Sequence, residues 1–133
     1  MSKCTQPEVD TMTPTELSRE IAEAMGWKKP HELGYKDLPD WFWYRSEKDK
    51  WVRAVESPFN PLRNWHHFGM VYEWMRGEGW NSSHGQPDND NTHTWIWWKG
   101  KLRNRTYQWV PADAPDIRRA MLLAALEAEG KRR

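Results

Sequence analysis

Apolar residues recur at spacings of three and four in three stretches of the chain, residues 13–26, 60–77 and 113–130. Each stretch opens with a threonine, asparagine or aspartate that can cap a helix, and a proline follows within two positions. In the first stretch, Thr13 and Glu16 also have the spacing of a capping box. Glycines close the stretches, as is common at helix ends. The pattern therefore predicts three helices.

Two pairs of short runs rich in aromatic and β-branched residues predict two β-hairpins. The first joins residues 41–44 to residues 51–55 through a five-residue polar turn. The second joins residues 95–98 to residues 106–110 through a turn with a basic tip. Residues 81–94 are almost wholly polar and are predicted to form a long loop. The expected order of elements is α-β-β-α-β-β-α.

This order predicts an α+β fold, with one largely antiparallel four-stranded sheet and three helices arranged as in an α/β/α sandwich. The runs Trp41-Phe42-Trp43-Tyr44 and Trp95-Ile96-Trp97-Trp98 do not alternate apolar with polar residues. A strand with one solvated face would alternate. Either helices cover both faces of the sheet, or one face presents an aromatic surface to a partner or to a second copy of the chain.

The length of 133 residues is typical of a single domain. We expect a flexible lead at residues 1–12, one domain at residues 13–130 and a basic tail at residues 131–133. The 11 Trp, 4 Tyr and 3 Phe supply the apolar volume that the few aliphatic residues do not. With 20 basic and 19 acidic residues the net charge is +1, which favours no polyanionic partner.

Cysteine content and hydropathy indicate a cytoplasmic protein. Cys4 is the one cysteine of the sequence and cannot form an intramolecular disulfide. No apolar run is long enough for a membrane span, and no signal-peptide pattern is present. We expect no membrane association.

Three stretches carry a family resemblance. They are residues 111–128 at the third helix, Ile21-Ala22-Glu23-Ala24-Met25-Gly26-Trp27 at the end of the first, and the Asn60-Pro61 opening of the second. Together they resemble small phage-encoded proteins with an α-β-α sandwich domain. The tyrosine-serine-threonine-aspartate-like opening of that family's central helix is absent, because Asn60-Pro61-Leu62-Arg63 stands there. The resemblance implies a bacteriophage or prophage accessory protein and transfers no catalytic residue.

The second hairpin is the candidate ligand site. Aromatic rings can stack on bases, and basic side chains can neutralise phosphates. On this hypothesis a nucleotide or a host partner binds at the residues Trp95, Trp97, Lys101, Arg103 and Arg105. The alternative interpretation is a packed aromatic layer with an ordinary solvated basic turn.

Four histidines are weak candidates for metal binding: His66, His67, His84 and His93. Their spacing fits no familiar ligand pattern, and adjacent histidines on a helix point in different directions. A metal-dependent nuclease would combine His66 and His67 with Asn91. The segment Asp88-Asn89-Asp90-Asn91 lacks the glycine and glutamate of a calcium loop. We expect no cofactor.

The leading hypothesis is a non-catalytic phage protein that binds a host bacterial protein, such as a defence component. No serine elbow or phosphate loop is present in the sequence, and no paired carboxylates in an apolar setting can be identified. The first alternative is a protein that sequesters a nucleotide signal, and the second is a metal-dependent nuclease.

Overall fold

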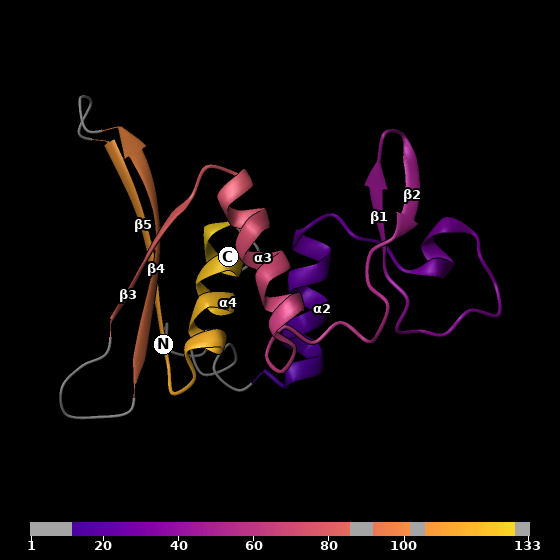
Figure 1. Cartoon of the computed structure of the whole chain (residues 1–133), viewed down its shortest axis with the longest axis horizontal. Helices are drawn as coiled ribbons and strands as arrows, with labels where there is room; N and C mark the ends of the chain where they lie inside the picture. Colours follow the sequence, from indigo (N-terminus) through magenta and orange to yellow (C-terminus); the bar gives the residue numbers. More distant parts are fainter. Residues whose placement is uncertain (1–11, 86–91, 102–105, 130–133) are drawn as a thin grey trace, which may run out of the picture.

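The computed structural model describes residues 12–85, 92–101 and 106–129. Within these ranges the chain forms three α-helices and five strands, in the order α-β-β-α-β-β-β-α (Figure 1). The elements are α2 (Pro14–Ala24), the short 3-10 helix η2 (Pro30–Leu33), β1 (Tyr44–Glu47), β2 (Lys50–Arg53), α3 (Trp65–Gly77), β3 (Asn81–Gly85), β4 (His93–Lys101), β5 (Thr106–Ala114) and α4 (Ile117–Ala128). The predicted α+β class is confirmed.

The strands form two antiparallel sheets, a β1-β2 hairpin and a three-stranded sheet of order β3-β4-β5. The predicted single four-stranded sheet is wrong, because the helices stand between the two sheets (Figure 1). The segment predicted as a loop at residues 81–94 also contains β3 and the start of β4. β3 has the sequence Asn-Ser-Ser-His-Gly and lies at an edge of the sheet, half-buried or exposed along its length. A polar edge strand shows no apolar alternation from which it could be predicted.

The first hairpin is shifted along the chain from its expected place. β1 begins at Tyr44, and Lys48 and Asp49 make the turn with φ of 49° and 66°. Two consecutive residues in the left-handed region indicate a type I′ turn, which matches the twist of a two-residue hairpin. Trp43 is buried just before the strand. Trp43 therefore contributes its ring to the core, and its carbonyl oxygen still accepts from the Ala54 amide at 2.8 Å across the hairpin.

The helix caps explain where the helices begin. In α2 the Glu16 amide donates to Thr13 Oγ1 at 3.1 Å and the Thr13 amide donates to Glu16 Oε1 at 2.9 Å, which confirms the predicted capping box. α3 begins later than predicted, since Asn64 is its cap and residues 60–64 form a turn. The cap of α4 is Asp116, whose side chain accepts from the Arg118 amide at 2.8 Å, because β5 continues to residue 114.

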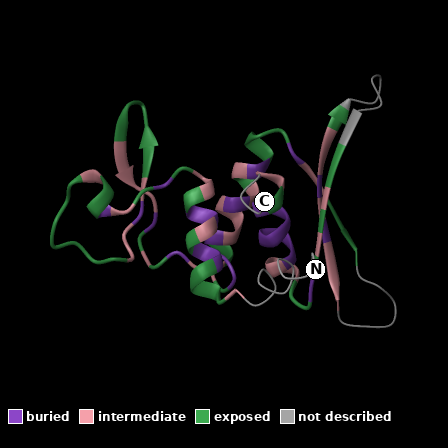
Figure 2. Cartoon of the chain, turned by 180° about the vertical axis from the view of Figure 1, so that it is seen from behind, coloured by how far each residue is buried: buried purple, intermediate pink, exposed green. Residues whose placement is uncertain are grey.

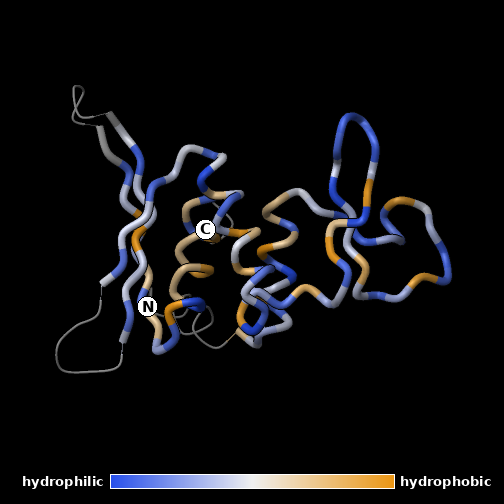
Figure 3. The backbone as a smooth tube through the Cα atoms, in the orientation of Figure 1, coloured by the Kyte–Doolittle hydropathy of each residue, from blue (hydrophilic) through white to orange (hydrophobic). Residues whose placement is uncertain are grey.

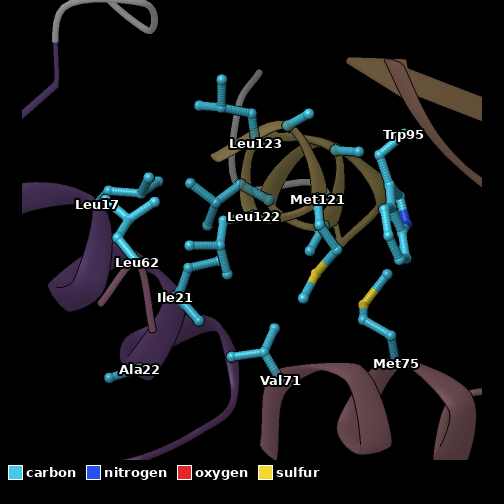
Figure 4. Close-up of a cluster of buried hydrophobic side chains, with 14 of the residues drawn as sticks. Leu17, Ile21, Ala22, Leu62, Val71, Met75, Trp95, Met121, Leu122 and Leu123 are labelled. Atoms are coloured by element: carbon cyan, nitrogen blue, oxygen red, sulfur yellow. The ribbon is translucent and has the colours of Figure 1, made fainter. Parts of the chain in front are cut away.

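Helix α4 is the centre of the core. Its residues 120–126 are all buried, so it has no solvent-facing side over nearly two turns. A helix that is apolar all round must be covered on every side. α4 contacts β4 and β5 on one side and α2 and α3 on the other. Figure 4 shows Ile21 of α2, Val71 and Met75 of α3, and Trp95 of β4 gathered around Met121.

Burial follows this layered arrangement. Buried positions concentrate in the helices and also occur in parts of the sheet and of the loops that join the helices to the first hairpin (Figure 2). Figure 3 shows apolar colours along α4, whereas the tryptophan-bearing strands are mostly pale or blue. In the described ranges all three helices lie on one side of the three-stranded sheet, so the expected cover on both faces is wrong (Figure 1). No helix in those ranges has the length and apolar character that crossing a membrane requires.

Candidate functional site: an aromatic cleft over helix α3

A cleft of about 910 Å³ runs over the outward side of α3. We call it the α3 cleft and define it by Arg45, Trp65, Phe68, Gly69, Tyr72 and Trp95. It lies within the size range of pockets that bind drug-sized ligands or anchoring side chains. Its walls are mainly aromatic, and Arg45 from β1 and Glu73 from α3 bring charges of both signs to the lining.

The sequence of α3 explains why an apolar cleft forms there. His67, Val71 and Met75 are spaced by four residues and face the core, where all three are buried. Trp65 and Tyr72 lie on other faces of the helix and are not buried. Trp65 is the most exposed large hydrophobic residue in the described part of the chain, at 64%. α3 thus has apolar side chains on more sides than its own fold covers.

Gly69 makes the middle of the cleft hollow. A Cβ atom placed on Gly69 would meet nothing within 4 Å, so this glycine is not required for packing within the chain. A glycine in a helix interior costs about 1 kcal/mol relative to alanine. The backbone of α3 is therefore open to close approach from outside, between the aromatic rings.

Trp95 forms the wall of the cleft on the sheet side. Its ring lies edge-on to Phe68 and Tyr72, at centroid distances of 6.4 and 6.3 Å, and it stacks on His84 at 6.1 Å. Only 9% of Trp95 is exposed, and its indole Nε1 is buried with no hydrogen-bond partner among the described residues. An unsatisfied buried donor is costly, so this indole nitrogen lowers the stability of the fold at this wall of the cleft.

The structure describes only some of the residues that were predicted to form a ligand site. Trp95 lines the cleft, whereas Trp97 is fully buried and donates from Nε1 to the Met121 carbonyl oxygen at 3.2 Å. The two rings lie 5.4 Å apart. Lys101 ends β4, and nothing is described of its side chain. Arg103 and Arg105 lie outside the described residues, so the combination of these cations with the aromatic rings stays a prediction.

The four histidines form two separate pairs. His66 is exposed and lines the cleft, while His67 is buried and its Nδ1 accepts from the Asn60 amide at 3.0 Å. Burial lowers the pKa of His67, and the neighbouring His66 lowers it further. In the other pair, His84 Nε2 and His93 Nδ1 lie 3.3 Å apart and the rings stack.

Neither histidine pair gains a third ligand. In residues 12–85, 92–101 and 106–129, no three His, Cys, Asp or Glu side chains come together closely enough to hold a metal ion. The acidic segment at residues 88–91, including Asn91, lies outside the described residues.

A second cavity, of about 340 Å³, lies beside the first turns of α2. We call it the polar cavity and define it by Ser18, Arg19, Lys29, Trp43 and Asn60. Ser18 Oγ and Asn60 Oδ1 are both buried without a hydrogen-bond partner in the described part of the chain. Lys29 Nζ lies 4.4 Å from the centre of the Trp43 ring and donates to the Asp40 carbonyl oxygen. The lining thus combines two cations with two residues that hold buried, unsatisfied polar atoms.

The second predicted helix carries apolar residues at positions 62, 65, 68, 72 and 75, which have helical spacing. The structure buries two of these, Leu62 and Met75, together with His67 and Val71. Trp65 is exposed, and Phe68 and Tyr72 are half-buried. Two features of the sequence indicate a surface cleft at this helix. It has more apolar residues than one face can hold, and Gly69 stands in its interior. The polar cavity joins α2 to residues distant in sequence, so no local pattern predicts it.

Comparisons with protein-family models, with curated proteins and with solved structures found no match to this chain.

Proposed function

We propose that this chain is a non-catalytic phage accessory protein that binds a host bacterial protein in the host cytoplasm, with the α3 cleft as its binding site. The observation that carries the proposal is the exposure of Trp65 beside an apolar cleft of about 910 Å³. Exposed aromatic clusters mark protein interaction sites, and tryptophan is among the commonest interface anchors. The family resemblance supports the phage origin.

The apolar lining of the cleft along α3 favours an amphipathic helix as the part of the partner that binds there. Helix-in-groove recognition places apolar side chains, spaced by three and four residues, into a hydrophobic groove. Gly69 lets the partner backbone approach α3 closely, and the rings of Trp65 and Tyr72 lie on either side of that position along the helix. Arg45 and Glu73 can pair with opposite charges at the margin of such a helix.

The test is a pull-down from lysates of several candidate host bacteria, followed by titration of the captured partner. Gly69→Arg adds a long side chain where a Cβ meets no atom of the chain, so it fills the cleft without disturbing the core. We expect it to weaken binding by at least tenfold. Trp109→Ser is the matched control, since Trp109 is 59% exposed and lies on β5, away from the cleft.

Two results would contradict the proposal. Undiminished capture by Gly69→Arg would exclude the α3 cleft as the binding site. Failure to capture any specific protein from the whole set of hosts would count against a host-protein partner.

A second candidate function, the sequestration of a small anionic signal such as a nucleotide, is supported by the polar cavity. Arg19 and Lys29 can neutralise a phosphate or carboxylate, and Ser18 and Asn60 of the lining hold buried polar atoms with no hydrogen-bond partner among the described residues. A nucleotide panel is expected to raise the melting temperature and quench tryptophan fluorescence. Lys29→Gln should reduce both responses, and their absence with every nucleotide would reject this function.

A further inference from the structure

The three-stranded sheet has a face that none of the described helices covers. We call it the outer face and define it by Ser83, Ile96, Trp98, Trp109 and Pro111. Alternate residues of a strand point to opposite faces, so Trp98 points away from the side on which Trp95 and Trp97 meet the helices. Cross-strand register places Trp98 opposite Trp109, and Ile96 opposite Pro111. These residues therefore share one side of the sheet.

The centre of the outer face is aromatic and open. The Trp98 and Trp109 rings stack with centroids 6.3 Å apart, and Trp98 Nε1 donates to Ser83 Oγ at 3.3 Å. Trp109 is 59% exposed, Pro111 is exposed, and Ile96 and Trp98 are only half-buried. In Figure 1 all the described helices stand on the opposite side of β3, β4 and β5.

The charge of the outer face restricts what can cover it. Among the described residues whose register places them on this side, Asp113 alone is charged at neutral pH, and Thr94 Oγ1 donates to its carboxylate at one end of the face. A nucleic acid or a strongly charged protein would find almost no charge to pair with. An identical neutral face would meet no like-charge repulsion at its centre, and the net charge of the whole chain is only +1.

We propose that two copies of this chain associate through their outer faces. β4 carries apolar residues on both of its faces, which is the pattern of a strand that is buried on both faces. Within the described ranges, however, its own chain buries only the face that carries Trp95 and Trp97. Two sheets stacked face to face, as in a β-sandwich, would bury the second face. Trp109 of each copy is the central anchor, since it is the most exposed ring on this surface.

The area of the face can be compared with what a specific interface needs. Nine residues of β4 span about 30 Å and three strands span about 14 Å, so one face covers roughly 400 Å² in projection. Two faces bury roughly 1,000 Å² once side-chain relief is included, which is near the lower limit for a specific interface. An interface near this limit fits a weak, reversible dimer, for which we expect dissociation at micromolar concentrations.

This association goes beyond the proposed function and uses a different surface. Trp95 faces the α3 cleft, whereas the next residue on the other side of the sheet, Ile96, faces the second copy. Dimer formation therefore leaves the α3 cleft open in each copy. The loss of one activity does not require the loss of the other.

Sedimentation velocity of the full chain, from about 1 to about 300 μM, tests the proposal directly. We expect the mass to rise from 16.0 kDa toward twice that value with increasing concentration. Trp109→Lys places a charge at the centre of the interface and is expected to raise the dissociation constant at least tenfold. Trp109→Thr serves as a second, strand-compatible variant, and circular dichroism checks the fold of both.

Trp65→Lys is the matched control, because Trp65 is similarly exposed, at 64% against 59% for Trp109, but lies on α3. It should leave the dissociation constant of the dimer unchanged while reducing capture of a host protein. A mass of 16.0 kDa at every concentration would overturn the proposal, as would dimerisation that survives both Trp109 variants. Neither result bears on the α3 cleft, so failure of the two proposals can be told apart.

Discussion

Replacing Trp97 by phenylalanine tests whether the tryptophans of β4 have different roles on the two faces of the sheet. Trp97 is fully buried, and its Nε1 donates to the Met121 carbonyl oxygen at 3.2 Å, which ties β4 to the central helix α4. Trp98, the next residue, is half-buried on the opposite face and donates to the Ser83 hydroxyl. Trp98→Phe is therefore the matched control: the same substitution, one residue away, on the other side of the strand.

The expected cost can be worked out from the two environments. At Trp97 the change removes the pyrrole part of a buried ring, equivalent to about two methylene groups, and costs about 2 kcal/mol in lost burial and void formation. The lost hydrogen bond adds about 1 kcal/mol. The total of about 3 kcal/mol lowers the melting temperature by roughly 10 °C for a domain of this size. At Trp98, where the partner and the ring edge are accessible to water, we expect a loss below about 1 kcal/mol.

Urea unfolding followed by far-ultraviolet circular dichroism measures both free energies of unfolding without depending on the tryptophan signal. The measurement is made at low protein concentration, so that association through the outer face does not contribute. A Trp97→Phe loss no larger than that of Trp98→Phe would refute the assignment of Trp97 to the core and Trp98 to the surface.

Two further predictions concern α3. Gly69→Ala should raise the free energy of unfolding by about 0.5–1 kcal/mol, because the new Cβ meets no atom within 4 Å and alanine is the better helix former; a loss of stability in urea unfolding would contradict this. His67 should make stability pH-dependent: burial, and then the nearby His66, lower its folded pKa, so protonation favours the unfolded chain. Stability should therefore fall as pH drops below about 6.5, the ordinary histidine pKa. His67→Asn retains an acceptor for the Asn60 amide and should flatten this dependence, and an unchanged slope would show that another group is responsible.

The features predicted correctly from the sequence are those set by short-range chemistry. Thr13 and Glu16 cap α2 as their spacing predicts, and Gly26 ends that helix with φ of 86°. The start of α3 was misplaced because Asn60-Pro61 and Asn64 both fit a helix start, and only tertiary packing decides between them. β3 was missed because pairing with β4, and not the polarity of its own residues, makes it a strand.

The candidate site was less predictable than the fold. Strand alternation separates Trp95 from Trp98, but it does not indicate which face meets the helices. That choice depends on α4, whose apolar surface packs against the side carrying Trp95 and Trp97. The α3 cleft depends on how three elements meet, so the helical spacing that includes Trp65 does not indicate that this residue is 64% exposed.

Four tryptophans, two in the core and one on each of two surfaces, show how substitutions of this residue type should be interpreted. Trp97 and Trp80 are buried, with indole nitrogens that donate to Met121 and Glu129, so their loss weakens the fold itself. Trp65 on α3 and Trp109 on β5 are the exposed tryptophans in the described part of the chain. Each of these two residues is more than half exposed, so much of its side chain does not take part in core packing. A Trp65 variant that retains stability but loses host-protein capture therefore identifies a binding role for Trp65. A Trp109 variant that retains stability but loses self-association does the same for Trp109, and each variant serves as the control for the other.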